Sequence, residues 1–254
     1  MIKEEIRVFF TALMFYTRIP CPSWVDHSPE YINKSTRYFS AIGVIVGAIG
    51  ALVFTLSAQL FSQSISILLS MIATIWVTGA FHEDGFADVL DGFGGGWTKE
   101  QKLTIMKDSR LGTYGTVGLI LILLLKYQAI HELPIHFIPF SIISAHTFSR
   151  FFASTLITYL PHVTSEGSKT KPVADGMPAR SVILSFVIAL PTLLLFRNWI
   201  IITVIPILLL FSFYMAYKFR KNIGGYTGDC LGATQQICEL GFYLSSVLIW
   251  NYWL

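Results

Sequence analysis

Charged side chains are scarce in this sequence, and their scarcity is the first constraint on the fold. Asp, Glu, Lys and Arg together make up 13% of the 254 residues, whereas 54% are hydrophobic. Soluble domains usually carry about 25% charged residues. A soluble fold of this length cannot bury so many apolar residues in such long runs, so the excess must face lipid. Composition therefore predicts an all-α, polytopic integral membrane helical bundle.

Cysteine is also scarce. Cys21, Cys230 and Cys238 are the only three, and none of them belongs to a CxxC pair. Their number and spacing exclude a disulfide framework and a thiolate zinc site. The chain also lacks internal repeats and low-complexity linkers, so we expect one membrane-embedded catalytic domain over residues 1–254.

The N-terminus lacks the features of a signal peptide. Glu4 and Glu5 lie among its first residues and no small-residue cleavage site follows, so we expect this segment to be retained. Its apolar residues recur at helical spacing. Residues 1–20 are therefore predicted to form an amphipathic helix at the membrane interface.

Seven segments are apolar enough to cross a membrane, a distance that takes about 20 residues of α-helix. They are residues 38–61, 64–81, 113–130, 134–160, 181–196, 199–217 and 237–254. The last segment ends in aromatic residues, which is typical of a helix that finishes at the membrane–water interface. We therefore predict about seven transmembrane helices plus the N-terminal interfacial helix.

Basic residues are divided unequally between the two sides that this topology defines. Fifteen of the 18 fall on one side, whereas the other side holds only Arg197; Lys126 and Arg150 lie within spans. Loops rich in Lys and Arg stay in the cytoplasm. We therefore expect a bacterial inner-membrane protein whose active site faces the cytoplasm. The long polar loops on that side are residues 82–112, 161–180 and 218–236.

The densest group of polar residues is HEDGFADVLDGFGGG, residues 82–96. If the second span continues as a helix, Asp84, Asp88 and Asp91 fall on one narrow stripe, because they are spaced i, i+4 and i+7. Three carboxylates this close repel one another, and a divalent cation such as Mg²⁺ removes that penalty. Glu83 points about 100° away and either supports these ligands or binds the metal from a distorted turn. The alternative is an exposed acidic loop.

Two further groups favour phosphate chemistry. In IMKDSRLGTYG, residues 105–115, Lys107 and Arg110 are suited to hold a diphosphate, although they could also simply anchor the chain at the membrane surface. Gly94 and Gly95 follow the acids and allow the backbone to approach a phosphate closely. The residues predicted to bind substrate here are therefore Lys107, Arg110, Gly94 and Gly95.

Polar residues in the fourth span and before the last span complete the pattern. His146 and Arg150 share one face, where they form either a salt bridge with an acid or a contact with substrate phosphate. In GGYTGDCLGA, residues 224–233, Thr227 and Gly228 surround Asp229 in a glycine-rich turn that suits phosphate or metal, or that merely re-enters the membrane. Acids, basic groups and glycine turns on one face indicate phosphoryl transfer.

At these residues the sequence resembles the adenosylcobinamide-GDP ribazoletransferase family, the cobalamin synthases. The matching stretches are residues 82–96, 105–115 and 224–233, with TRIP at 17–20 and HTFSR at 146–150. They occur in the family's order over nearly the whole chain. One departure is Ser40, where the family pattern has proline.

The resemblance implies a Mg²⁺-dependent membrane enzyme that joins adenosylcobinamide-GDP to α-ribazole, or to its 5′-phosphate, and releases GMP. Asp84, Asp88 and Asp91 would hold Mg²⁺ on the diphosphate, and Asp229 would hold a second metal or orient the acceptor. Either His82 or His146 would serve as the general base. The implied partners are these small molecules and the lipid bilayer, without nucleic acid, and a homo-oligomer is left open.

Two alternatives belong to other classes of membrane protein. A CDP-alcohol phosphatidyltransferase also has an aspartate-rich metal site, but its pattern needs an Arg where Asp88 stands and an Asp where Gly96 stands. A cation transporter would use the acids as an ion path. Its coupling residues are expected near the membrane midplane, often with repeat symmetry, whereas these acids cluster at the ends of spans.

Overall fold

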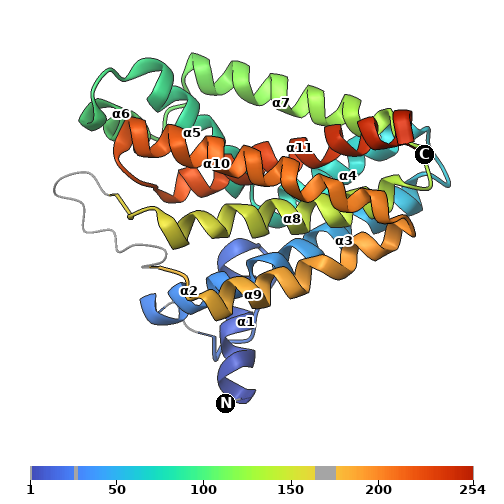
Figure 1. The fold of residues 1–254 in the computed structure, drawn as a ribbon, viewed down its shortest axis with the longest axis horizontal. Helices are drawn as coiled ribbons and strands as arrows, with labels where there is room; N and C mark the ends of the chain where they lie inside the picture. The colour runs from blue at the N-terminus through green and yellow to red at the C-terminus, as the bar shows by residue number, and fades with distance from the viewer. Residues whose placement is uncertain (1, 26–27, 164–175, 254) are drawn as a thin grey trace.

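A computed structural model of the protein describes residues 2–25, 28–163 and 176–253, and these residues are mainly α-helical (Figure 1). The α-helices are α1 (Ile2–Tyr16), α2 (Pro29–Ser35), α3 (Phe39–Ser57), α4 (Gln63–Thr78), α5 (Phe81–Gly95), α6 (Lys99–Ile105), α7 (Thr113–His131), α8 (Ile138–Tyr159), α9 (Ala179–Ala189), α10 (Val204–Ile223) and α11 (Gly228–Trp253). Short 3₁₀ helices span Thr36–Tyr38, Leu190–Phe196 and Trp199–Thr203. The predicted all-α class is confirmed.

The long helices lie side by side around α8, which is buried along most of its length (Figure 1). Helix α3 approaches α8 closely at two glycines. A side chain at Gly47 would come within 2.7 Å of the Ile143 Cα atom, and one at Gly43 would meet the backbone of Thr147 at the same distance. Small residues let membrane helices make such close backbone contacts, so this pair forms the tight centre of the bundle.

The predicted number of seven spans is not confirmed. Within the described residues, four segments are long and apolar enough to cross a membrane: 29–57, 113–131, 179–196 and 199–223. The bent pair α4–α5 raises that number to five if it counts as one span. Helices α8 and α11 have the length, at 22 and 26 residues, but they fall outside this set. Their buried polar side chains make them less apolar than lipid-facing helices.

Helix α4 does not continue into the acidic motif as the simplest prediction required. The chain bends by 86° between α4 and α5. Gly79 and Ala80 form this bend with left-handed φ angles of 65° and 58°. Glycine adopts this conformation without steric penalty, whereas alanine is strained in it. The acidic residues therefore lie on a new helix, α5, which is directed across the end of the bundle.

The N-terminal segment forms the predicted helix. Val8 and Ala12 of α1 are buried against the bundle, whereas Ile2 and Ile6 are exposed. Helix α1 runs across the direction of the long helices (Figure 1). That direction is the one expected of a helix lying in the membrane plane, and its interfacial location stays a prediction.

Two of the three predicted polar loops are wrong as loops, because they are largely helical. Residues 82–112 contain α5 and α6, and residues 218–236 contain the end of α10 and the first turns of α11. Backbone groups near a membrane must be hydrogen-bonded within the protein, and helices satisfy this requirement locally. Of the 161–180 segment, residues 164–175 lie outside the described residues.

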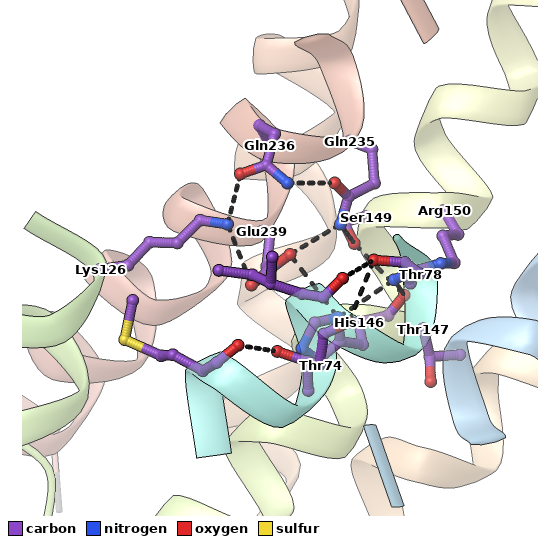
Figure 2. Close-up of polar contacts among 12 residues, drawn as sticks. Thr74, Thr78, Lys126, His146, Thr147, Ser149, Arg150, Gln235, Gln236 and Glu239 are labelled. Atoms are coloured by element: carbon purple, nitrogen blue, oxygen red, sulfur yellow. Dashed lines mark hydrogen bonds and ion pairs between the residues drawn. The ribbon is translucent and has the colours of Figure 1, made fainter. Parts of the chain in front are cut away.

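Connected polar side chains cross the centre of the bundle between α7, α8 and α11 (Figure 2). Lys126 donates to the side-chain oxygen of Gln236 at 2.6 Å and forms an ion pair with Glu239 at 3.1 Å. Glu239 also accepts from Gln235 at 2.7 Å, and its carboxylate lies 3.6 Å from Nδ1 of His146. All five side chains are buried, so each charge depends on its partners.

This polar network reaches two residues that the sequence pattern marked as functional. The guanidinium of Arg150 donates to Nδ1 of His146 at 3.1 Å and to the His146 carbonyl oxygen at 3.0 Å. On the other side, Nε2 of Gln236 donates to Oε1 of Glu83 at 3.0 Å. The network therefore connects the core of the bundle to the acidic helix α5.

Replacing Lys126 with methionine is expected to destabilise the protein strongly. The substitution leaves the buried carboxylate of Glu239 without its cation, which typically costs about 3–5 kcal/mol. The double variant Lys126→Met/Glu239→Gln removes both charges and is expected to recover part of the loss. Thermal unfolding in detergent measures both effects, with Lys221→Met on the exposed end of α10 as the control. A Tm for Lys126→Met equal to that of the control would show that the ion pair contributes little.

Candidate functional site

The acidic helix α5 rests directly on the first turns of α11. A side chain at Gly85 would come within 2.9 Å of the Asp229 Cα atom, and one at Gly232 would come within 3.2 Å of the His82 carbonyl oxygen. The two backbones therefore touch, which any larger residue would prevent. Residues 84 and 229, separated by more than half of the chain, are neighbours for this reason.

The carboxylates around this crossing influence one another. Asp84 is exposed and Asp88 is partly buried on α5. Burial, followed by repulsion from Asp229, Asp84 and Asp91, raises the pKa of Asp88 from its ordinary value of 3.8 to about 7. A carboxyl group under such repulsion favours either a proton or a bound cation. The predicted stripe of acids thus exists, and it includes an acid from a second helix.

Asp229 is held in place by the residue that begins its helix. The Thr227 hydroxyl donates to Oδ2 of Asp229 at 3.2 Å and accepts from the Cys230 backbone N–H at 3.3 Å. Thr227 therefore caps α11. Burial raises the pKa of Asp229 to about 6, although the Thr227 hydrogen bond acts in the opposite direction. Gly228 is the first residue of α11, directly between Thr227 and Asp229.

Asp91, the third acid of the stripe, is directed toward α7. Its Oδ2 atom accepts from the Gly112 backbone N–H at 2.7 Å, and its Oδ1 atom accepts from the Gly115 N–H at 2.9 Å. The side chain is buried, with 8% of the residue exposed. Sequence spacing alone does not distinguish this residue from Asp84 and Asp88, because the periodicity says nothing about the helix that packs opposite.

The two basic residues of the α6–α7 segment have different surroundings. Lys107 lies close enough to Asp229 for its charge to lower the pKa of that carboxyl group. Arg110 forms an ion pair with Asp108, with Nη2 2.6 Å from Oδ2, and its side chain is 88% exposed. The structure thus brings Lys107 to the acids, whereas Arg110 is bound to its own loop.

The predicted glycines Gly94 and Gly95 end α5 and are exposed. Gly94 lies against the ring of Tyr114, where a side chain would come within 2.6 Å of the ring carbons. Gly95 leaves more room, because its nearest neighbour is the Ile105 side chain at 3.4 Å. Phosphate binding by these two glycines stays a prediction.

The histidines and Glu83 lie behind the acids, on the bundle side of α5. His82 is buried and its ring stacks on Phe39, with centroids 5.8 Å apart. Within the described residues, Nε2 of His82 and Oε2 of Glu83 have no hydrogen-bond partner. Both residues line the same cavity as His146 and Arg150. His146 and Arg150 thus lie in the core network behind the acidic stripe.

Metal binding by these residues has to be judged from the types and positions of their atoms. Among the described residues, no three His, Cys, Asp or Glu side chains are already arranged to hold a metal ion. Mg²⁺ does not need such a cage, because it usually binds one or two carboxylates and completes its coordination with water and substrate phosphates. Asp84, Asp88 and Asp229 present only oxygen ligands around one helix crossing, so the residues fit Mg²⁺.

Sequence analysis missed the residues that support the site from within the bundle. Gln235, Gln236 and Glu239 of α11 were not predicted, and Lys126 was noted only as a charge within a span. A signal was present, because charged residues inside membrane segments are usually paired with one another. The sequence alone could not say which residues form the pairs.

Comparison with known proteins supports one family over nearly the whole length. Residues 8–247 match the family described as cobalamin-5-phosphate synthase. The chain is similar to proteins of three Shewanella species that are named adenosylcobinamide-GDP ribazoletransferase. The protein of S. frigidimarina is 46% identical over 246 residues, which cover 95% of this chain and 94% of the relative.

The other two relatives also match the chain over nearly its whole length. The protein of S. oneidensis is 42% identical over 97% of this chain and 95% of its own length. The protein of S. piezotolerans is 43% identical over 99% and 98%, respectively. No solved structure matches the chain. From the family match and these relatives, the chain belongs to the cobalamin-5-phosphate synthase family, whose members are transferases of cobalamin synthesis.

Proposed function

We propose that this protein joins adenosylcobinamide-GDP to α-ribazole, or to α-ribazole 5′-phosphate, by Mg²⁺-dependent phosphoryl transfer. The observation that carries the proposal is the convergence of Asp84, Asp88 and Asp229 at the α5–α11 crossing, with Lys107 nearby. Relatives named for this activity cover nearly the whole chain. Family membership also disfavours the phosphatidyltransferase and transporter alternatives.

The reaction converts a phosphoanhydride bond of the GDP moiety into a phosphodiester. The 3′-hydroxyl oxygen of the ribazole forms a bond to the phosphorus that carries the aminopropanol arm. The bond between that phosphorus and the oxygen bridging to GMP breaks, so GMP leaves and the acceptor proton is released. In such reactions the protein mainly positions the reactants and stabilises negative charge.

Asp84, Asp88 and Asp229 would hold Mg²⁺, with Glu83 beside them. Bound Mg²⁺ supplies charge neutralisation on the diphosphate oxygens and orients the phosphorus for attack. Lys107 stabilises the negative charge that develops on the GMP leaving group. Thr227 keeps Asp229 directed toward the crossing, because its hydroxyl binds that carboxylate.

His82 is the stronger candidate for the general base. Its Nε2 atom has no hydrogen-bond partner among the described residues, and the ring is next to Gly228 and Gly232 in one apolar pocket. His146 instead has its Nδ1 atom between Arg150 and Glu239. Proton removal from the acceptor hydroxyl therefore needs less rearrangement at His82.

The proposed site lies at the end of the bundle formed by α5, α6 and the start of α11 (Figure 1). The basic residues of α6 and of the end of α10 lie in the same region of the chain's fold, which favours the cytoplasmic side. A site at the membrane surface would let both a water-soluble nucleotide and a large amphipathic corrinoid reach the acids.

Replacing Asp84 with asparagine is expected to abolish Mg²⁺-dependent product formation. Purified protein in liposomes is supplied with adenosylcobinamide-GDP and α-ribazole, with and without Mg²⁺, and GMP and the corrinoid product are measured. We expect product from the wild type only with Mg²⁺, and a loss of roughly 100-fold or more in the variant, since direct charge stabilisation is removed. Folded wild-type protein that yields no product with Mg²⁺ would overturn the proposed function.

The pKa of Asp88 predicts a dependence of stability on pH in metal-free protein. Because the folded-state pKa is raised from 3.8 to about 7, the folded state binds more protons than the unfolded state between these values. Stability should therefore fall as pH rises from about 5 through 7. Asp88→Asn should lose this part of the pH dependence, and added Mg²⁺ should stabilise the wild type most at high pH.

Thermal unfolding of wild type and Asp88→Asn in buffers of increasing pH, with EDTA or with Mg²⁺, measures this effect. The unmodified protein in EDTA is the reference at each pH. If the curves of Tm against pH for wild type and Asp88→Asn in EDTA run parallel, Asp88 is not the source of the pH dependence.

A further inference from the structure

The contacts of Asp91 differ from those expected of a metal ligand. Both of its carboxylate oxygens accept hydrogen bonds from backbone N–H groups, those of Gly112 and Gly115, at the start of α7. The N-terminus of a helix attracts a carboxylate through these unpaired N–H groups and through the helix dipole. Asp91 is a residue of α5 that serves as the capping group of another helix, twenty-one residues along the chain.

The two glycines are required by this contact. A side chain at Gly112 or at Gly115 would collide with the Asp91 carboxylate. The two glycines of G-T-Y-G, residues 112–115, thus leave space at the start of α7 for the Asp91 side chain of α5. No other residue of the described α7 N-terminus offers a side-chain cap to these N–H groups.

The same contact fixes one end of the segment that carries Lys107. Residues 106–112 connect α6 to α7, and both ends of this segment contact α5. Met106 is buried and packs on Gly92, the neighbour of Asp91, whereas Gly112 is bound by Asp91 itself. Lys107 lies within this held segment, where its charge acts on Asp229.

We propose that Asp91 is a positioning residue that holds the 106–112 segment, and with it Lys107, beside the Asp84–Asp88–Asp229 site, and that it does not bind the metal. The proposal rests on the proposed function for its kinetic consequences, but its metal-binding consequence does not depend on turnover. In this proposal Asp84 and Asp88 face α11 and bind the metal, whereas Asp91 faces α7 and anchors it.

The decisive comparison is between Asp91→Asn and Asp88→Asn in the intact protein. An asparagine at 91 keeps one acceptor oxygen but turns an NH₂ group toward the second N–H, so the anchor is weakened while the shape is kept. Direct Mn²⁺ binding to protein in detergent, without substrates, reports the ligands. We expect Mn²⁺ affinity within about twofold of wild type for Asp91→Asn, and a loss of about tenfold or more for Asp88→Asn.

Kinetics then test the link to Lys107. We expect Asp91→Asn to raise KM for adenosylcobinamide-GDP with a smaller change in kcat, as Lys107→Met should. Because both substitutions act on one contact, the double variant should be no worse than Lys107→Met alone. Mn²⁺ affinity lost as fully as in Asp88→Asn, or strictly additive effects of the two substitutions on KM, would overturn the proposal.

Gly115→Ala disturbs the same anchor from the α7 side and covers the case in which Asp91→Asn does not fold. It should leave Mn²⁺ binding intact and raise KM in the same way, and weakened Mn²⁺ binding in this variant would contradict the proposal. Wild-type protein that binds Mn²⁺ but makes no product refutes the proposed function, and the metal comparison still decides on Asp91. Wild-type protein that makes product without binding Mn²⁺ refutes the metal site, and the KM comparison then decides.

Discussion

The contact between the backbones of α5 and α11 at Gly85 and Gly232 is the constraint on which the site depends. It places Asp84 and Asp88 of α5 beside Asp229 of α11, although these residues belong to two distant parts of the chain. Any side chain at these glycines would separate the helices and move Asp229 away from Asp84 and Asp88. The 86° bend after α4 has the same effect, because it directs α5 across the end of the bundle and against the start of α11.

Behind this crossing, the bundle holds charges that a membrane interior tolerates only in pairs. Lys126 and Glu239 neutralise each other, and Gln236 joins this pair to Glu83 on the acidic helix. Breaking such a buried pair is costly, although an apolar replacement of both partners often is not. Its hydrogen bonds have a directional geometry that apolar packing lacks, and this fixes the rotation of α11 relative to α5.

The site combines carboxylates that repel one another with a lysine, Lys107, whose charge acts on Asp229. Asp88 and Asp229 both have raised pKa values, so the metal-free protein stores unfavourable charge at the place where Mg²⁺ is proposed to bind. Asp91 belongs to the same stripe by sequence but is satisfied by α7. Neighbouring acids of one motif thus have different contacts because different helices face them.

The sequence by itself determined the membrane helical class, the single helix that carries Asp84, Asp88 and Asp91, and the family, since hydropathy, helical period and long motifs are local properties. The predicted count of seven spans is not confirmed, because α8 and α11 carry polar side chains on their buried faces and fall outside the helices that are apolar enough by composition. Only the tertiary structure decided that Asp91 caps α7, that Arg110 binds Asp108, and that Lys126 meets Glu239 and Gln236. Those pairings depend on which helix faces which, and packing between distant segments settles that, whereas local periodicity does not.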